Sequence, residues 1–112
     1  NRKFPCSDGL QYRDFIYIDD VVDAIIKCLK NKKASGEIFN VGSGKPEQVI
    51  KLIKKINFKI KKGTPIFGKI KLRNDESLKI YPNINKIKNF INWKPKTTLE
   101  KGLLKTINYY GK

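Results

Sequence analysis

The sequence predicts a small mixed α/β protein in which short strands alternate with amphipathic helices. With 112 residues, 39% of them hydrophobic, the chain is long enough for one small domain with a modest core. Short aromatic and β-branched runs indicate strands, and apolar residues at helical spacing indicate helices between them. The predicted order is strand, helix, strand, helix, extended segment, helix, helix. This is an α/β pattern, with too few strands for a complete doubly wound sheet.

The first strand and helix are predicted from the sequence FIYIDDVVDAIIKCL. Residues 15–18 are aromatic or β-branched and indicate a short buried strand. Asp19 or Asp20 then accepts hydrogen bonds from the first N–H groups of a helix and complements its dipole. The helix ends near the sequence NKKASG, with Gly36 beyond it. Its expected buried face consists of Val21, Val22, Ile25, Ile26 and Leu29.

A second strand is expected at residues 38–41, followed by a turn that contains Gly42, Gly44 and Pro46. The sequence EQVIKLIKKI then predicts a helix, whose apolar face consists of Val49, Ile50, Leu52, Ile53 and Ile56. A strand, a Gly-x-Gly turn and a helix resemble the opening of a dinucleotide site. The third glycine and the acidic residue about 20 positions further on are absent, so we interpret the glycines as a tight turn.

The last third of the chain predicts an extended segment and two helices. Residues 65–73 are expected to be extended, and a short helix is expected from Asn85 to about Ile91 with three inward-facing side chains, those of Ile87, Phe90 and Ile91. Thr97 and Glu100 have the spacing of a capping box before the final helix. The apolar stripe of that helix consists of Leu99, Leu103, Leu104 and Ile107.

The formal net charge of +15 raises the possibility of a basic nucleic-acid-binding module. Up to residue 30 five acidic residues balance five basic ones, and all the surplus lies downstream. The lysines accompany many isoleucines and asparagines, which indicates a compositional bias, and only Phe58 and Phe67 are aromatic in the lysine-dense segment. Nucleic acid is therefore not the expected partner, and the following lysines are interpreted as a solvated face: Lys51, Lys54, Lys55, Lys59, Lys61 and Lys62.

Several kinds of site have no sequence signal. The chain has no histidine, no phosphate loop, no nucleophile elbow and no paired-cysteine zinc site, so no catalytic or metal-binding residue is predicted. Cys28 is expected to be a small buried hydrophobe. No apolar run approaches the roughly 20 residues of a membrane span, and together with the cysteine usage this predicts a cytoplasmic location. A start without Met suggests a piece of a larger protein.

Three charged residues stand out, namely Arg13, Arg73 and Glu76. Arginine is scarce in this chain, since only three of the 25 basic residues are arginines. Arg13 and Arg73 are two separated guanidinium groups, an arrangement that suits a diphosphate, since each can bind two phosphate oxygens with parallel hydrogen bonds. Glu76 lies nearby in sequence, and a carboxylate suits a sugar or ribose hydroxyl. From spacing alone, ordinary surface ion pairs remain an alternative.

A family resemblance bears on that choice. The sequence DGLQYRDFIYIDDVVDAI resembles a segment of the extended short-chain dehydrogenase/reductases, the NAD-dependent nucleotide-sugar epimerase and dehydratase family. GEIFNVGSGKP is similar to the next strand and turn of that family, and the sequence from Arg73 to Tyr110 is similar to its C-terminal run. The resemblance implies the C-terminal portion of a Rossmann-type fold, namely the substrate-binding subdomain with the last sheet elements.

The resemblance also implies roles for individual residues. Arg13 and Arg73 match the two family arginines that contact the diphosphate of the nucleotide-sugar, and Asp14 could orient the Arg13 guanidinium. Glu76 matches an acidic residue that holds the ribose in some members, although aspartate is more usual there. Gln11 matches a glutamine near the substrate loop. The chain departs from the family pattern at three helix-start positions, Gln48, Asn83 and Asn85.

The family's Tyr-x-x-x-Lys pair and Gly-rich cofactor loop are absent, so residues 1–112 are expected to be the substrate-binding region of an enzyme whose N-terminal cofactor domain is missing. The intact enzyme would use NAD or NADP, act on a nucleotide-diphosphate sugar and form a homodimer. The portion alone would bind no cofactor and be inactive. Its uncovered edges predict poor solubility or oligomers. A non-catalytic remnant of a truncated gene is the other alternative.

Overall fold

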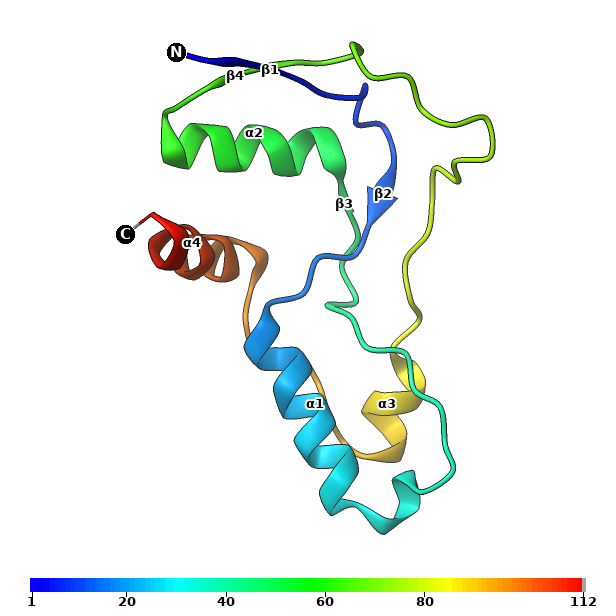
Figure 1. Cartoon of the computed structure of the whole chain (residues 1–112). Coiled ribbons are helices and arrows are strands. Elements are labelled where there is room, and N and C mark those ends of the chain that lie inside the picture. The colour runs from blue at the N-terminus through cyan, green and yellow to red at the C-terminus, as the bar shows by residue number, and fades with distance from the viewer. Residues whose placement is uncertain (112) are drawn as a thin grey trace. The chain divides into compact units, whose positions relative to one another are not determined.

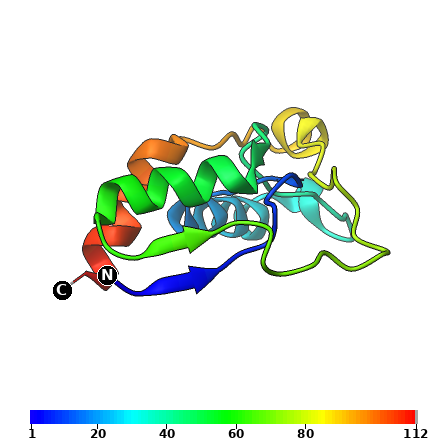
Figure 2. The same cartoon turned by 90° about the horizontal axis from the view of Figure 1, so that it is seen from above.

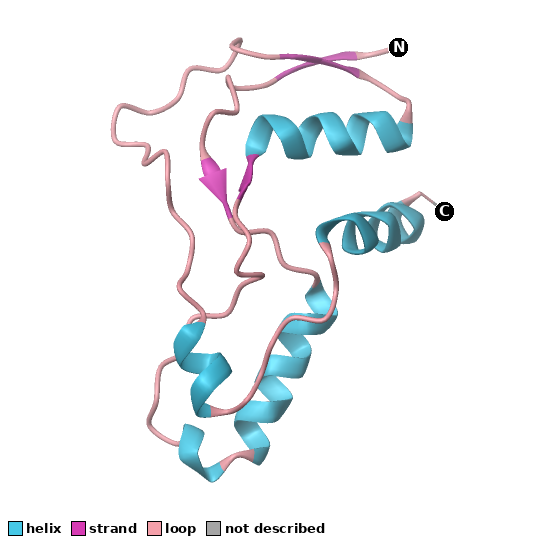
Figure 3. Ribbon diagram, turned by 180° about the vertical axis from the view of Figure 1, so that it is seen from behind, coloured by secondary structure: helices cyan, strands magenta, loops and turns pink. Residues whose placement is uncertain are grey.

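The structure is a computed structural model of the chain and describes residues 1–111. It contains four α-helices with short strands and long connecting loops (Figure 3), as the sequence predicts for a small mixed α/β chain. Two compact units are present. Residues 1–13 and 47–80 form unit 1, while residues 14–46 and the chain from Tyr81 onward form unit 2.

Unit 1 contains four short strands and one helix. Strand β1 (Lys3–Pro5) pairs in parallel with β4 (Thr64–Ile66), and helix α2 (Val49–Ile60) lies beside this pair (Figures 1 and 2). Strand β2 (Tyr12–Arg13) pairs antiparallel with β3 (Glu47–Gln48). The chain connects β3 directly to α2, so the β2 and β3 pair is anchored at the start of the helix.

Helix α2 forms where the apolar spacing predicts a helix. It begins at Val49, after Gln48 with an extended backbone, and ends at Ile60. The residue that caps this end, Lys61, has a left-handed φ of 57°. None of the apolar side chains of α2 is fully buried. Ile53 and Ile56 line a hollow of about 300 Å³ together with Phe4 of β1, which shows how the helix contacts the strand pair.

Unit 2 contains the buried core. Its elements are α1 (Ile18–Lys30), a 3-10 helix η1 (Lys32–Ala34), α3 (Asn85–Phe90) and α4 (Leu99–Tyr110), and α1 lies beside α3 in Figures 1 and 3. The core cluster consists of Ala24, Ile84, Ile87, Ile91 and Trp93. Ile87, Phe90 and Ile91 were expected to face inward. Ile87 and Ile91 are buried, which confirms the expectation, whereas Phe90 is 39% exposed, which corrects it. Cys28 packs against this cluster, as expected of a small hydrophobe.

The strands expected at residues 15–18 and 38–41 are not formed. Residues 15–17 are irregular and α1 begins at Ile18, and residues 37–41 are irregular as well. Neither segment has a strand partner within residues 1–111, and an extended segment without a partner makes no ladder. The side chains of Ile16, Phe39 and Val41 nevertheless pack against the core. Ile18 is 61% exposed and Ile38 is 85% exposed, so the burial predicted for residues 15–18 is only partly confirmed.

The apolar face of α1 is largely uncovered in this chain. Val22, Ile25 and Ile26 are 43–54% exposed and Leu29 is 82% exposed, which corrects the prediction that this face is buried. Ala24 was not among the residues of the predicted apolar face, but it is the apolar residue of α1 that is buried in the core cluster. The spacing of apolar residues therefore predicts the helix, but it does not predict which face of α1 packs against the core of unit 2.

Two further expectations need correction. Only Thr64–Ile66 forms a strand in the region expected to be extended, and the chain turns after Ile66. The cap of α4 is Thr98, whose Oγ1 accepts the N–H of Lys101 at 3.3 Å, in place of Thr97. Thr97 lies one residue before the cap and donates its own N–H to the Asp20 carboxylate at 2.9 Å, which is a tertiary contact.

Candidate anion-binding site

The backbone of unit 1 fixes the position of Arg13. In the antiparallel pair of β2 and β3, Arg13 lies opposite Glu47. On the other edge of β2, the N–H of Tyr12 donates to the carbonyl of Leu78 at 2.6 Å, and the N–H of Ile80 donates to the carbonyl of Tyr12 at 3.4 Å. Strand β2 is therefore held between β3 and the segment that contains Leu78, which restricts where the Arg13 side chain can go.

The two arginines that the sequence singles out meet on one carboxylate. Arg13 Nη2 donates to Glu76 Oε1 at 2.8 Å across 63 residues of sequence, and Arg73 Nη2 donates to Glu76 Oε2 at 3.4 Å. The chain thus brings both guanidinium groups to the two oxygens of a single side chain. Sequence spacing alone did not predict this convergence, because β2 and the turn that carries Arg73 are distant along the chain.

The three side chains differ in how far they are exposed. Glu76 is 19% exposed and Arg13 is 25% exposed, whereas Arg73 is 79% exposed. A turn brings Arg73 and Glu76 together, since the N–H of Glu76 donates to the carbonyl of Arg73 at 3.0 Å. Arg73 Nε also lies 3.9 Å from Asp75, which is itself exposed. Arg13 is therefore the enclosed and fixed member of the pair, and Arg73 is the solvent-facing one.

Gln11 precedes β2 and is half-buried. Its backbone carbonyl accepts the N–H of Val49 at 3.0 Å, which ties the start of α2 to this segment. The side-chain Oε1 is buried and has no hydrogen-bond partner within residues 1–111. Buried amide oxygens are normally satisfied, so this atom is a free acceptor for a hydroxyl or N–H group.

Asp14 does not orient the Arg13 guanidinium. Its carboxylate accepts the backbone N–H of Ser43 at 2.7 Å and that of Gly44 at 2.9 Å. The first Arg13 nitrogen, Nη1, donates to the carbonyl of Tyr12 at 2.7 Å, and the second contacts Glu76. The orienting groups of Arg13 are therefore a backbone carbonyl and Glu76, and the expectation for Asp14 is wrong.

A second ion pair adjoins Arg13 in the β2 and β3 pair. Glu47, opposite Arg13, accepts from Lys55 Nζ at 2.9 Å. This hydrogen bond is the main reason why the pKa of Glu47 lies below its ordinary value, with smaller contributions from the Gln48 N–H and the charge of Lys51. Burial opposes the shift. Sequence reasoning missed this pair, since Lys55 was assigned to a solvated face.

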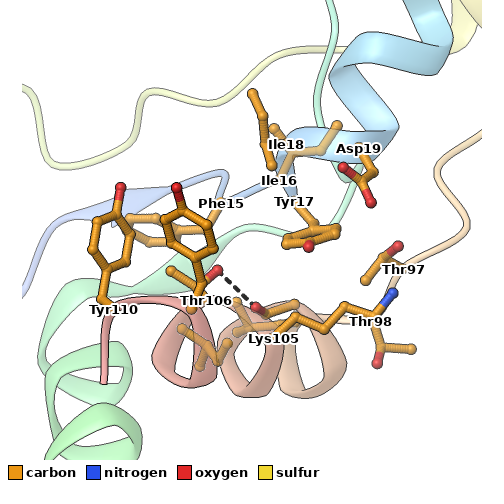
Figure 4. A pocket seen from close by; sticks show the side chains of 14 residues that line it. Phe15, Ile16, Tyr17, Ile18, Asp19, Thr97, Thr98, Lys105, Thr106 and Tyr110 are labelled. Atoms are coloured by element: carbon orange, nitrogen blue, oxygen red, sulfur yellow. Dashed lines mark hydrogen bonds between the residues drawn. The ribbon is translucent and has the colours of Figure 1, made fainter. Parts of the chain in front are cut away.

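A separate hollow of about 600 Å³ lies in unit 2 between residues 15–19 and α4 (Figure 4). Its walls are mainly apolar and aromatic, and Thr106 donates back to the carbonyl of Gly102 at 2.8 Å within α4. Gly102 allows the close approach of Tyr17, because a Cβ at this position would lie 3.1 Å from the Tyr17 Cβ. A glycine in the middle of a predicted helix is the only sequence signal for this hollow.

The described side chains give the site the chemistry of an oxyanion receptor. Among residues 1–111 no three His, Cys, Asp or Glu side chains are grouped so that they could hold a metal ion. None of the helices in that range is both long and apolar enough to cross a bilayer. Two guanidinium groups within reach of one acidic side chain can bind an anion that bears at least two oxygens.

Comparison with known proteins places the chain in a family. Residues 1–106 match the family described as GDP-mannose 4,6 dehydratase. The chain therefore belongs to this family of extended short-chain dehydrogenase/reductases, which comprises NAD-dependent epimerases and dehydratases. This confirms the resemblance identified in the sequence and the expected fold class.

Individual relatives support the assignment. The UDP-glucuronate 4-epimerase of Thermodesulfobacterium geofontis is 35% identical over 107 residues, which cover 91% of this chain and 31% of the relative. A crystal structure of the Thermotoga maritima UDP-glucose 4-epimerase with UDP-glucose is 29% identical, with a TM-score of 0.85 over 97% of this chain and 35% of its own. The Bacillus cereus UDP-glucuronic acid 4-epimerase, in complex with UDP-glucuronic acid and NAD, is 27% identical with a TM-score of 0.83, over 97% of this chain and 35% of its own. The chain spans about a third of each relative's length.

Proposed function

We propose that this chain is the substrate-binding portion of an NAD-dependent nucleotide-sugar epimerase or dehydratase, and that it binds the diphosphate of the nucleotide-sugar through Arg13 and Arg73. The observation that carries the proposal is that both guanidinium groups reach the carboxylate of Glu76. Groups that converge on one anionic side chain can also converge on an anionic ligand. Family membership and the UDP-sugars bound to two solved relatives support the same class of ligand.

The geometry assigns different tasks to the two arginines. Arg13 is three-quarters buried and held at Nη1 by a backbone carbonyl, so it presents a guanidinium with little freedom to an approaching phosphate. Arg73 is exposed and lies on a turn, so it can close over the second phosphate after the first is bound. Gln11, with its unpartnered buried oxygen, is a candidate for a hydroxyl contact.

The Gly-Ser-Gly turn at residues 42–44 does not offer free N–H groups to a dinucleotide phosphate. A dinucleotide phosphate needs free backbone N–H groups in a Gly-rich turn. In the Gly-Ser-Gly turn of this chain the N–H groups of Ser43 and Gly44 are already taken by Asp14, and a Cβ at Gly42 would contact Pro82 and Asp14. We therefore propose that NAD chemistry belongs to the remaining part of the whole enzyme, and that this chain contributes substrate binding.

Calorimetric titration of UDP into the chain tests the proposal. Arg13→Lys keeps the charge but loses the planar fork, so the affinity for UDP should fall roughly tenfold, since hydrogen bonds to charged groups contribute about 1.5–3 kcal/mol. Arg73→Lys should weaken binding less, because its side chain is more exposed. Arg2→Lys, at the third arginine of the chain, is the matched control and should leave the affinity within about twofold. Equal affinities for all four proteins, or no binding of UDP, would overturn the proposal.

A further inference from the structure

We infer that Glu76 is an internal competitor anion, which keeps small oxyanions such as sulfate off the two arginines. The inference rests on the proposed diphosphate site and adds a selectivity to it. Glu76 occupies both guanidinium groups at once, Oε1 with Arg13 at 2.8 Å and Oε2 with Arg73 at 3.4 Å. An oxyanion that binds each of the two arginines with two parallel bonds must use the Nη2 groups that Glu76 already contacts.

The bonding at Arg13 makes this competition direct. A guanidinium presents two edges from which two parallel N–H bonds can reach an oxyanion, and Nη2 belongs to both edges. Glu76 is bound at Nη2, and Nη1 already donates to the Tyr12 carbonyl at 2.7 Å. A ligand that binds Arg13 with two bonds therefore either displaces the carboxylate or lies beside a second negative charge. Both outcomes lower the affinity.

Charge and burial indicate which anions overcome this barrier. Two guanidinium groups and one carboxylate leave a net charge of about one positive unit, which attracts a small anion only weakly. Glu76 is 19% exposed, so its ion pair with Arg13 is less screened than a surface pair. It is also tethered on a turn next to Arg73 and is therefore always at high local concentration. Only an anion that is longer and more highly charged than sulfate, such as a diphosphate, can replace both of its contacts.

The neighbouring acidic residue provides a matched control. Asp75 carries the same charge one position earlier, but it is 85% exposed and lies 3.9 Å from Arg73 Nε. Asp75→Asn changes the net charge of the chain as much as Glu76→Gln does. If the effect of Glu76 came only from the general field of the protein, the two substitutions would change anion affinity equally.

The test titrates sodium pyrophosphate and sodium sulfate, at constant ionic strength, into the original chain, Glu76→Gln and Asp75→Asn. We expect Glu76→Gln to bind sulfate roughly tenfold more tightly, because a competing charge-assisted hydrogen bond is removed, and to bind pyrophosphate more tightly by a smaller factor, because pyrophosphate already displaces the carboxylate in the original chain. Asp75→Asn should change either affinity by less than about twofold. Glu76→Ala provides a second variant, and circular dichroism of each protein establishes that it is folded.

Each other outcome has a definite meaning. If Glu76→Gln binds sulfate no more tightly than the original chain, or gains as much affinity for pyrophosphate as for sulfate, while Arg13→Lys still weakens UDP binding, the inference is wrong and the diphosphate site stands. A loss of affinity in Glu76→Gln would also overturn it and would make Glu76 a positioning residue for the arginines. If neither the original chain nor Glu76→Gln binds any of the anions, both the inference and the proposed function fail.

Discussion

The Asp14 carboxylate accepts the backbone N–H of Ser43 at 2.7 Å, although 29 residues separate them in sequence. The second oxygen of the same carboxylate accepts the N–H of Gly44 at 2.9 Å. One ionised side chain thus satisfies two neighbouring backbone donors in a turn that has no helix or strand to pair with them. Asp14 is therefore a structural clamp within unit 2.

Replacement of Asp14 by Asn should destabilise unit 2. An amide offers one acceptor oxygen, so one N–H group of the turn loses its partner, at a cost of about 1–3 kcal/mol. Urea unfolding followed by the fluorescence of Trp93, which is 1% exposed in the unit 2 core, measures the change. Asp19→Asn is the control, since Asp19 is exposed in the first turn of α1 and contributes about 0.3–1 kcal/mol through the helix dipole. Equal losses in the two variants would contradict the clamp.

Gly42 should tolerate no side chain, for steric reasons. A Cβ there would lie 2.5 Å from Pro82 Cγ and 2.8 Å from Asp14 Oδ2, so Gly42→Ala forces the ring or the clamp to move. We expect a loss of about 3 kcal/mol in the same urea assay, at the upper end of the range for overpacking.

Gly36 provides the comparison for Gly42. It has a φ of +76° and nothing within 4 Å of a built Cβ, so Gly36→Ala reports left-handed backbone strain alone. The expected loss is about 1 kcal/mol. A Gly36→Ala protein that is destabilised as much as Gly42→Ala would show that the contacts at Gly42 relax easily.

Asp20 links two elements of unit 2. It is 4% exposed, and its carboxylate accepts the N–H groups of Lys96 at 3.1 Å and Thr97 at 2.9 Å, just before α4. Asp20→Ala removes both acceptor oxygens and should therefore increase amide hydrogen exchange at Lys96 and Thr97 by roughly five- to a hundredfold, which corresponds to a loss of about 1–3 kcal/mol. Exchange at Lys101, whose N–H is capped by Thr98, serves as the internal reference. Unchanged exchange at Thr97 would refute the link.

The aspartates at and before the start of α1 show how far the sequence predicts this structure. The apolar spacing predicts helix α1, but Asp19 or Asp20 was expected to cap it, and this is wrong: the helix begins at Ile18, both aspartates lie in its first turn, and the cap residue Tyr17 makes no side-chain hydrogen bond. The partners of Asp14 and Asp20 are distant backbone N–H groups, and local patterns contain no information about them. For the same reason Thr97 was expected to cap α4, whereas Thr98 is the cap and Thr97 donates its N–H to Asp20.

The strands were harder to predict than the helices. A helix satisfies its hydrogen bonds within its own segment, so the spacing in α2 and α4 is sufficient to predict them. A strand exists only beside a partner, and residues 15–18 and 38–41 have none within residues 1–111. The strand pair that positions Arg13, between β2 and β3, was not predicted, since two-residue strands carry no periodicity. The convergence of Arg13 and Arg73 on Glu76 depends on this pairing.

The ion pair between Glu47 and Lys55 should make the stability of unit 1 depend on pH in the acid range. The pKa of Glu47 is lowered in the folded chain from an ordinary value of 4.5, chiefly by its hydrogen bond with Lys55. A carboxyl group whose folded pKa lies below its unfolded pKa stabilises the fold above the unfolded value. This contribution is therefore complete above about pH 4.5 and is lost as the pH falls through the lowered pKa of Glu47.

The side-chain carboxyl carbon of Glu47, followed by NMR as a function of pH, measures this pKa directly. Lys55→Met removes the hydrogen bond and the nearest charge, so the Glu47 pKa should rise toward its ordinary value. Lys51→Met is the matched control, because Lys51 acts on Glu47 only through a smaller coulombic contribution, and it should raise the pKa less. Glu47 in β3 lies opposite Arg13 in β2. Lys55→Met therefore also tests whether the ion pair between Glu47 and Lys55 supports the strand that positions the Arg13 guanidinium. A Glu47 pKa that is the same in the original chain and in Lys55→Met would exclude the ion pair as its cause.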